Sequence, residues 1–333
     1  MSSPLFRLTG LTLAGSDVPR LNAVTLQIPC GATAVVGLSG AGKTSLLNVL
    51  AGFESGFSGE LKSGISGGPA HRLPLFWVPQ SAGLWPHLTA EQHLEVVGHE
   101  VVQRQKSSSE SVRLLKKTDE LLELFDLTHR RRALPAELSQ GERSRLAMAR
   151  ALATRATVLL LDEPLSHVDP VRKPTYWKIV QRIVAEENIS MVFTSHEPET
   201  VLRHAEHVIC LQDGAVMFGG PVRTLYEHPP DAQGGAFLGP LNWFRKEESA
   251  VFLNENTAGS AVAVRPERMQ IRMADDSVIE LLATPFVGSY QESIVQHVES
   301  GMTKSVLHQV PDVVIPIGHR VAFRVQPQSG RTP

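Results

Sequence analysis

Short apolar runs alternate with longer helical patterns over the chain up to about residue 215. The runs that predict buried strands end in or near turn formers and lie at residues 35–36, 75–78, 158–161 and 191–193. Between residues 88 and 150 these runs stop. There the apolar residues recur at the spacing of an amphipathic helix, namely at Leu114, Leu115, Leu121, Leu122, Leu124 and Phe125. The pattern predicts an α/β core with a largely parallel sheet and a helical insertion.

The pattern changes after the turn-forming segment Pro229–Gly235, which indicates a linker. Beyond it, short strands are predicted at near-regular spacing, at residues 260–264, 278–282, 293–298, 305–310 and 320–325. Such spacing is typical of a small β-barrel or sandwich. We therefore predict an α/β domain over residues 1–232, with a helical subdomain at about 85–150, and a C-terminal all-β domain over residues 233–333.

Length and composition are those of a globular protein. The 333 residues allow two domains, and 42% hydrophobic residues with a net charge of −2 point to neither disorder nor nucleic-acid coating. Cys30 and Cys210 lack metal-ligand spacing and favour free thiols in a reducing compartment. The sequence lacks a signal peptide and an apolar run of roughly 18 to 20 residues, so we expect a cytosolic chain that other subunits bring to a membrane.

A glycine-rich loop follows the apolar run at 35–36 and precedes a helical stretch. Its pattern, G-x-x-x-x-G-K-[ST], spans Gly37, Leu38, Ser39, Gly40, Ala41, Gly42, Lys43 and Thr44, with Ser45 next. Backbone N–H groups of such a loop and the helix N-terminus form a phosphate cradle. Lys43 is expected to reach the β- and γ-phosphates, and Thr44 to ligate Mg²⁺. The alternative is a merely flexible turn.

Two acids end the apolar run at 158–161. A buried strand of a parallel sheet delivers such residues to the sheet's carboxyl edge, where ligands bind. We expect Asp162 to hold Mg²⁺ through water and Glu163 to polarise the attacking water. In isolation the two acids are also compatible with capping of the following turn.

The segment Leu138-Ser139-Gln140-Gly141-Glu142 resembles the signature motif of ABC proteins. That resemblance implies a segment that opens a helix and covers the γ-phosphate of ATP held by the opposite subunit, so that the site is shared across a homodimer. Gln140 and Glu142 depart from the commonest form, Leu-Ser-Gly-Gly-Gln. Ser139 and Gly141, the expected phosphate donors, are retained, and we expect activity to survive.

Other landmarks of that family occur in the same order. Gln80 resembles the glutamine that approaches Mg²⁺ and the attacking water, and Asp169 belongs to a stretch similar to the loop that links the two sites of the dimer. His196 resembles the switch histidine that contacts the γ-phosphate. The aromatic residue that stacks on adenine is missing, because Ala14 stands at its position. Phe6 is either its substitute or a buried strand residue.

Residues 83–90 are similar to the segment of importer ATPases that receives a permease coupling helix. Trp85 and Leu88 are expected either to fill a groove there or to pack within the helical subdomain. The tail resembles that of the maltose, polyamine, ferric-iron and sulfate importer ATPases, which implies an OB-like regulatory or dimer-stabilising domain. Arg265 and Glu267 in this tail suggest either an effector site or a pair at a turn.

The resemblance implies an ATPase that energises a bacterial importer from the cytoplasmic face of the plasma membrane. Its expected partners are two permease subunits and, indirectly, a substrate-binding protein. The alternative is a soluble ABC ATPase that acts on nucleic acid or the ribosome. The chain has one ATPase unit and no heptad run, and the basic residues 129–132 are interpreted as a solvated face. An exporter subunit would have no reason to carry this tail.

Overall fold

The computed structural model describes residues 3–65, 73–103, 117–253 and 261–327. The chain forms two compact units that divide between Val222 and Arg223, ahead of the domain boundary expected at residue 232. The segment Pro229–Gly235 belongs to the second unit. It includes the start of helix α8 (Ala232–Ala236), whose N-cap Asp231 accepts a hydrogen bond from the Gly234 amide at 2.6 Å. The turn formers therefore build a capped helix rather than an extended linker.

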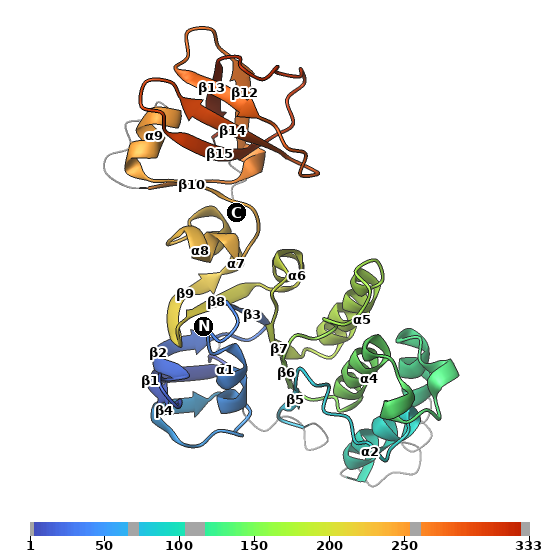
Figure 1. The fold of residues 1–333 in the computed structure, drawn as a ribbon. Helices are drawn as coiled ribbons and strands as arrows, with labels where there is room; N and C mark the ends of the chain where they lie inside the picture. The colour runs from blue at the N-terminus through green and yellow to red at the C-terminus, as the bar shows by residue number, and fades with distance from the viewer. Residues whose placement is uncertain (1–2, 66–72, 104–116, 254–260, 328–333) are drawn as a thin grey trace. The chain divides into compact units, whose positions relative to one another are not determined.

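A six-stranded sheet in the order β5-β6-β7-β3-β8-β9 forms the centre of the first unit (Figure 1). Its strands are parallel except for the edge strand β9, which runs antiparallel to β8. The strand bounds are β3 (Ala32–Val36), β5 (Phe76–Val78), β6 (Val158–Leu161), β7 (Ser190–Thr194), β8 (His207–Gln212) and β9 (Ala215–Pro221). All four residues of β6 are buried, as expected of a strand covered on both faces. The four predicted core strands are confirmed.

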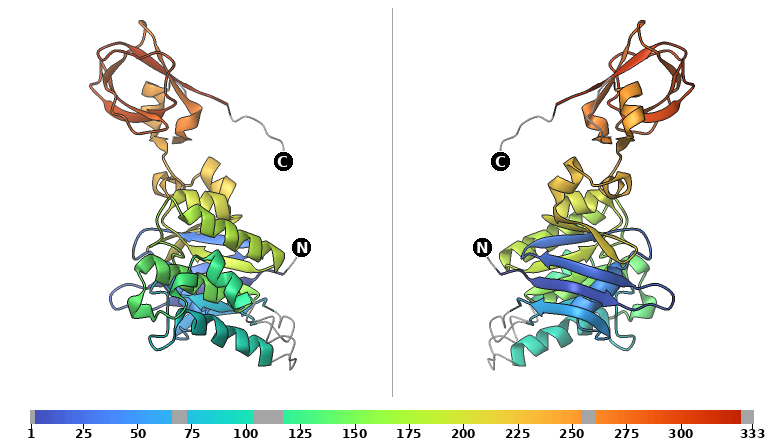
Figure 2. Two further views of the ribbon diagram at one scale, coloured as in Figure 1. Left: turned by 90° about the vertical axis from the view of Figure 1, so that its right-hand side faces the viewer. Right: turned by 90° about the vertical axis from the view of Figure 1, so that its left-hand side faces the viewer.

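A second, antiparallel sheet in the order β2-β1-β4 lies beside the first, and its strands are seen side by side in Figure 2. It consists of β1 (Phe6–Leu13), β2 (Leu21–Ile28) and β4 (Phe57–Ser63). Helix α1 (Lys43–Leu50) contributes Leu46, Leu47, Val49 and Leu50 to the core formed with both sheets. This packing fixes the start of α1, and with it the phosphate loop, against the end of β3.

Helices and short 3-10 turns make up the described residues between 88 and 150. The bounds are α2 (Ala90–Gln103), a helix over residues 117–124, η1 (Thr128–Arg130), η2 (Pro135–Glu137) and α4 (Gln140–Ala153). Leu121, Leu122 and Phe125 are buried as predicted, whereas Leu114 and Leu115 lie outside the described residues. Two further helices, α5 (Lys173–Glu186) and α6 (Pro198–His204), follow β6 and β7.

The second unit is a β-structure with short helices. After α7 (Val222–Glu227) and α8 come β10 (Asn242–Phe244), α9 (Lys246–Phe252), β11 (Val262–Val264), η3 (Pro266–Arg268), β12 (Met269–Met273), β13 (Ile279–Ala283), β14 (Gln291–His297), β15 (Thr303–His308) and β16 (Val321–Val325). The strands pair antiparallel as β10-β11, β12-β16 and β13-β14-β15. They enclose a separate apolar core that includes Phe244, Leu281 and Val306. The sequence pattern predicted most of these strands but not β10, β12 or α9.

None of the helices among the described residues is long and apolar enough to cross a membrane.

Candidate functional site

The glycine-rich loop forms a concave turn between β3 and α1. Gly40 and Gly42 have φ angles of 81° and 101°, in the left-handed region that favours glycine. A Cβ atom at Gly42 would lie 2.5 Å from the Arg20 carbonyl oxygen, so only glycine fits there. The Lys43 ammonium donates to the carbonyl oxygens of Gly37 at 2.8 Å and Leu38 at 2.9 Å, which folds the side chain over the loop. The loop and the start of α1 thus present backbone amides and a lysine charge to one site, which suits a triphosphate.

The two acids that follow β6 are fixed by a hydroxyl from the neighbouring strand. Thr194, at the end of β7, donates to Asp162 Oδ1 at 2.7 Å and accepts from the Glu163 amide at 2.7 Å. The other oxygen of Asp162 accepts from the Thr44 hydroxyl at 2.8 Å. The carboxylate of Asp162 is therefore tied both to the first turn of α1 and to β7. Two hard oxygen donors, from Thr44 and Asp162, meet beside the phosphate loop, which is the donor chemistry that Mg²⁺ prefers.

The side chain of Glu163 meets Gln80 and His196. Glu163 itself has a φ of 50°, so the chain turns sharply after the strand. Gln80 Nε2 donates to one of its carboxylate oxygens at 3.1 Å, and His196 Nδ1 lies 3.5 Å from the other. Gln80 reaches this position because β5 pairs with β6, and the Asp162 amide donates to the Val78 carbonyl at 2.9 Å. Two residues from distant parts of the sequence thus contact the two oxygens of one carboxylate.

Ser139 begins the helix predicted at the signature segment, and Glu142 completes a reciprocal cap. The Ser139 hydroxyl accepts from the Glu142 amide at 3.2 Å, and the Glu142 carboxylate accepts from the Ser139 amide at 2.8 Å. Arg130 donates to the other carboxylate oxygen at 3.1 Å. Burial acts to raise the pKa of Glu142, but the hydrogen bonds from Ser139 and Arg130 outweigh it and lower this pKa to about 2. Glu142 therefore fixes the helix start as an anion.

The loop that contains Asp169 packs against the same helix start. A Cβ atom at Gly141 would lie 3.1 Å from the His167 carbonyl oxygen, so the backbones of the two segments approach closely. Asp169 Oδ1 accepts from the Val171 amide at 2.8 Å, and its carbonyl oxygen accepts from the Lys173 amide at 2.9 Å. Gln140 is exposed at the first position of α4. Within a single chain, the signature segment thus lies beside the Asp169 loop.

The stretch around Ala14 is open. Ala14 is exposed and lines a hollow of about 490 Å³ together with residues 15–18 and Arg20. Arg20 donates to the Ala14 carbonyl oxygen at 3.1 Å and pairs with Glu54 at 2.7 Å. Phe6 is only 1% exposed and belongs to the core between the two sheets. Of the two interpretations of Phe6, the structure supports the buried strand residue.

Trp85 is held by neighbours on α2 and α4. Its amide donates to His93 Nε2 at 2.9 Å, its ring stacks on that of His93, and the guanidinium of Arg150 lies 4.8 Å from the ring centre. Arg150 is buried and donates to the carbonyl oxygens of Ala82 and Gly83. Trp85 remains 37% exposed and Leu88 is half-buried. Trp85 thus packs within the helical subdomain, which was one of the two alternatives, and it also remains partly exposed to solvent.

Arg265 and Glu267 do not pair with each other. The Arg265 guanidinium is buried and donates to the carbonyl oxygens of Tyr226, Gly235, Gly239 and Pro240 at 2.9–3.1 Å. It also lies 4.1 Å from the centre of the Tyr226 ring. Glu267 instead accepts from the Tyr226 hydroxyl at 2.6 Å. Arg265 therefore cross-links the start of the second unit, which is a structural role.

Sequence reasoning missed Thr194 as a site residue. Its hydroxyl contacts both acids after β6, yet in sequence it is a threonine at the end of an ordinary β-branched strand. Its position at the end of the strand that pairs with β6, two residues before His196, is the signal that points to it. Sequence reasoning also did not identify Arg130, in the basic run at residues 129–132, as the partner of Glu142.

The fold and the loop define the P-loop class of nucleotide-binding proteins. Residues 21–166 match the ABC transporter family. The Fe(3+) ions import ATP-binding protein FbpC of Yersinia pestis is 30% identical over 314 residues, which cover 85% of this chain and 86% of that protein. The molybdenum import ATP-binding protein ModC of Thiobacillus denitrificans is 39% identical over 211 residues, which cover 60% of this chain and 55% of that protein.

Two solved structures share the fold. An ATP-binding subunit of an ABC transporter superimposes with a TM-score of 0.57 at 21% identity, covering 67% of this chain and 92% of that one. A dimeric ATP-binding cassette in a post-hydrolysis state, bound to ADP and Pi, superimposes with a TM-score of 0.55 at 24% identity. The match covers 66% of this chain and 99% of that one. The chain belongs to the ATP-binding proteins of ABC transporters, of the importer type. It is an ATPase of that family, and the relatives do not favour a protein that acts on nucleic acid.

Proposed function

We propose that this chain hydrolyses ATP at two sites shared by a head-to-tail homodimer and thereby drives a bacterial importer. The observation that carries the proposal is the connected set of contacts from Thr44 through Asp162 and Thr194 to Glu163, with Gln80 and His196 around the Glu163 carboxylate. This set begins at the phosphate loop. An ionised carboxylate beside the site of the terminal phosphate is the group needed to orient an attacking water.

Each remaining residue has a proposed part. The amides of residues 37–45 and the Lys43 ammonium bind the triphosphate, for which Lys43 exchanges its carbonyl partners for phosphate oxygens. His196 contacts the terminal phosphate. Thr44 and Asp162 would hold Mg²⁺, with Gln80 close to it. This cation supplies positive charge that stabilises the charge on the transferring phosphoryl group.

The signature segment of the second copy completes each site. The Ser139 hydroxyl oxygen already accepts from the Glu142 amide, so its proton is available to an anionic acceptor. We propose that Ser139, Gln140, Gly141 and Glu142 at the start of α4 cover the terminal phosphate of the partner's ATP, and that Asp169 links the two sites. The amides at this helix start and its positive dipole end suit that role.

We propose that the dimer acts on two permease subunits at the cytoplasmic face of the plasma membrane, with a substrate-binding protein as an indirect partner. The outward-facing part of the Trp85 ring, held by His93 and Arg150, is a candidate contact for a permease segment. The second unit, with its own apolar core, would act as a regulatory or dimer-stabilising β-domain. The first unit, which ends at Val222, would then form the ATPase domain, which is shorter than the 1–232 expected from the sequence.

The test is hydrolysis of Mg-ATP by the purified chain and by Glu163→Gln, with the dimer followed by size-exclusion chromatography. We expect the variant to lose hydrolysis by at least about 100-fold, in line with loss of a positioned general base. It should also accumulate an ATP-bound dimer that Ser139→Arg, placed at the proposed interface, prevents. Hydrolysis by Glu163→Gln at the wild-type rate would rule out the proposed role of this carboxylate.

A further inference from the structure

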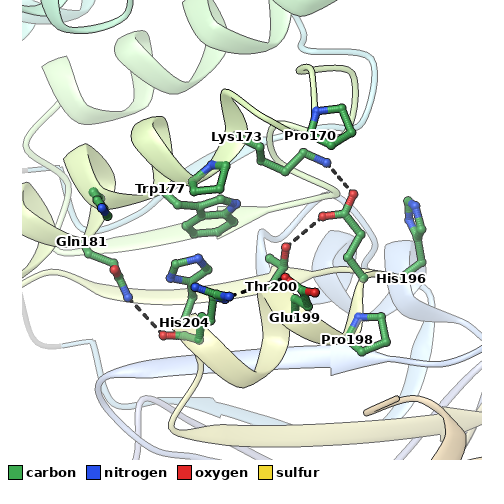
Figure 3. A pocket seen from close by; sticks show the side chains of 13 residues that line it. Pro170, Lys173, Trp177, Gln181, His196, Pro198, Glu199, Thr200 and His204 are labelled. Atoms are coloured by element: carbon green, nitrogen blue, oxygen red, sulfur yellow. Dashed lines mark hydrogen bonds and ion pairs between the residues drawn. The ribbon is translucent and has the colours of Figure 1, made fainter. Parts of the chain in front are cut away.

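A pocket of about 540 Å³ lies between helices α5 and α6, which follow the Asp169 loop and His196 in the chain (Figure 3). Its walls combine the stacked rings of Trp177 and His204, whose centres are 4.5 Å apart, with charged side chains at one end. His196 stands at that end (Figure 3). The pocket is therefore bordered by a residue already assigned to the nucleotide site.

Lys173 and Glu197 form an ion pair across this end of the pocket, drawn as a dashed line in Figure 3. The Lys173 side chain is only 9% exposed and that of Glu197 is 35% exposed. The Thr200 hydroxyl donates to the second carboxylate oxygen of Glu197 at 2.8 Å. Burial acts to raise the pKa of Glu197, but the hydrogen bonds from Lys173 and Thr200 outweigh it and lower this pKa. The Glu197 carboxylate is thus ionised at neutral pH, and each of its oxygens has a donor.

Each partner of the pair is attached to a different segment of the proposed nucleotide site. Lys173 is the first residue of α5, and its amide donates to the Asp169 carbonyl at 2.9 Å. Glu197 directly precedes α6 and directly follows His196, and its amide donates to the Ser195 hydroxyl at 3.1 Å. His196 in turn lies 3.5 Å from Glu163. A continuous chain of contacts therefore runs from Asp169 through the ion pair to the carboxylate of Glu163.

We infer that Lys173 and Glu197 are positioning residues for ATP hydrolysis, which fix the switch histidine relative to the Asp169 loop. This inference rests on the proposed function and adds to it two residues outside the nucleotide-contacting motifs. The physical basis is geometric, since an ion pair with a buried lysine and a carboxylate that accepts two hydrogen bonds favours one separation of the two segments. The carboxylate also lies at the N-terminal end of α5, where the helix dipole favours an anion.

The test compares hydrolysis with stability in Lys173→Met, Glu197→Gln and the double variant. Lys173→Met leaves the partly buried carboxylate of Glu197 without its cation, so both the melting temperature and kcat should fall. In the double variant both charges are gone, so the melting temperature should return to near the wild-type value. The hydrolysis defect should remain, with kcat lower by roughly tenfold and the KM for ATP little changed, because the phosphate loop is untouched.

Two further variants complete the design. Lys178→Met removes an exposed lysine that lines the same pocket from the same helix, and should leave kcat and melting temperature unchanged. Lys173→Arg retains the cation and should retain most of kcat. A double variant that regains wild-type kcat together with its melting temperature would overturn the inference, because the pair would then be only structural. Glu163→Gln is measured alongside. If it hydrolyses ATP at the wild-type rate, the proposed function fails, whereas if it is inactive, a normal kcat in the double variant contradicts only this inference.

Discussion

Replacement of Glu142 by glutamine removes the anion from the start of α4 while keeping the size of the side chain. The Glu142 carboxylate accepts from the Ser139 amide at 2.8 Å and from Arg130 at 3.1 Å, and its side chain is 10% exposed. A glutamine oxygen can still accept from the Ser139 amide, but its amide group faces the Arg130 guanidinium. The variant therefore tests the negative charge of residue 142 separately from its hydrogen bond to the Ser139 amide.

The magnitude follows from the pKa of Glu142, which is lowered from 4.5 to about 2. A shift of about 2.5 units, at about 1.4 kcal/mol each, stabilises the folded state by about 3 kcal/mol at neutral pH. Because the folded pKa is depressed, this stabilisation is complete above the unfolded pKa and is lost as the pH falls from about 4.5 towards about 2. At pH 3.5 roughly 1.4 kcal/mol of it is gone.

The assay is urea unfolding of wild type and Glu142→Gln at pH 7 and pH 3.5, both in a Trp243→Phe background. Trp243 is the one tryptophan of the second unit, so the fluorescence of the remaining three reports on the first unit. We expect the variant to be about 3 kcal/mol less stable at pH 7, with a difference of roughly half that at pH 3.5. Glu123→Gln, an exposed carboxylate on the preceding helix, should change stability by less than about 0.5 kcal/mol.

An equal difference at the two pH values would show that the charge of Glu142 contributes nothing and that only its shape matters. A difference below about 0.5 kcal/mol at pH 7 would contradict the strong pairing with Arg130.

Two further changes test other parts of the molecule. Ala14→Tyr supplies a ring beside the open hollow and should tighten ATP binding about two- to tenfold in calorimetry, because stacking contributes about 0.5–1.5 kcal/mol. Phe6→Leu, in the buried core, should leave the affinity for ATP unchanged. If Phe6→Leu weakened ATP binding and Ala14→Tyr had no effect, the adenine would not lie beside Ala14. Arg265→Met removes donors from four carbonyl oxygens and should lower the stability of the second unit by at least about 4 kcal/mol. Hydrogen exchange of its strands measures this loss, with exposed Arg272→Met as the control.

The central sheet could be predicted because its strands are short, continuous apolar runs buried on both faces, as in β6. The antiparallel sheet is harder to recognise. In β1 the alternation of buried and exposed residues is interrupted between Leu8 and Leu11, where the pairing with β2 shifts register and Gly10 has a φ of 58°. A bulge of this kind breaks the period of two on which a sequence-based prediction depends.

The site residues on short motifs could be predicted because each motif has a fixed place at a strand end or a helix start. The contacts of Glu142 with Arg130, and of Lys173 with Glu197, could not. The members of these pairs are separated by 12 and 24 residues along the chain and meet only through the packing of different helices. For Arg265, the sequence suggested either an effector site or a pair with Glu267, whereas in the fold its guanidinium donates to four carbonyl oxygens.

Thr194 matters for any design that transfers the two acids after β6 to another parallel sheet. Its one hydroxyl donates to Asp162 and accepts from the Glu163 amide, so the strand beside the acidic one sets the direction of both acids. Valine has nearly the same shape and suits a strand equally well, but it can do neither. A transplanted pair of acids therefore needs a serine or threonine from the adjacent strand, because a design that copies only the acidic strand would leave one oxygen of the first carboxylate and the backbone amide of the second acid without this partner.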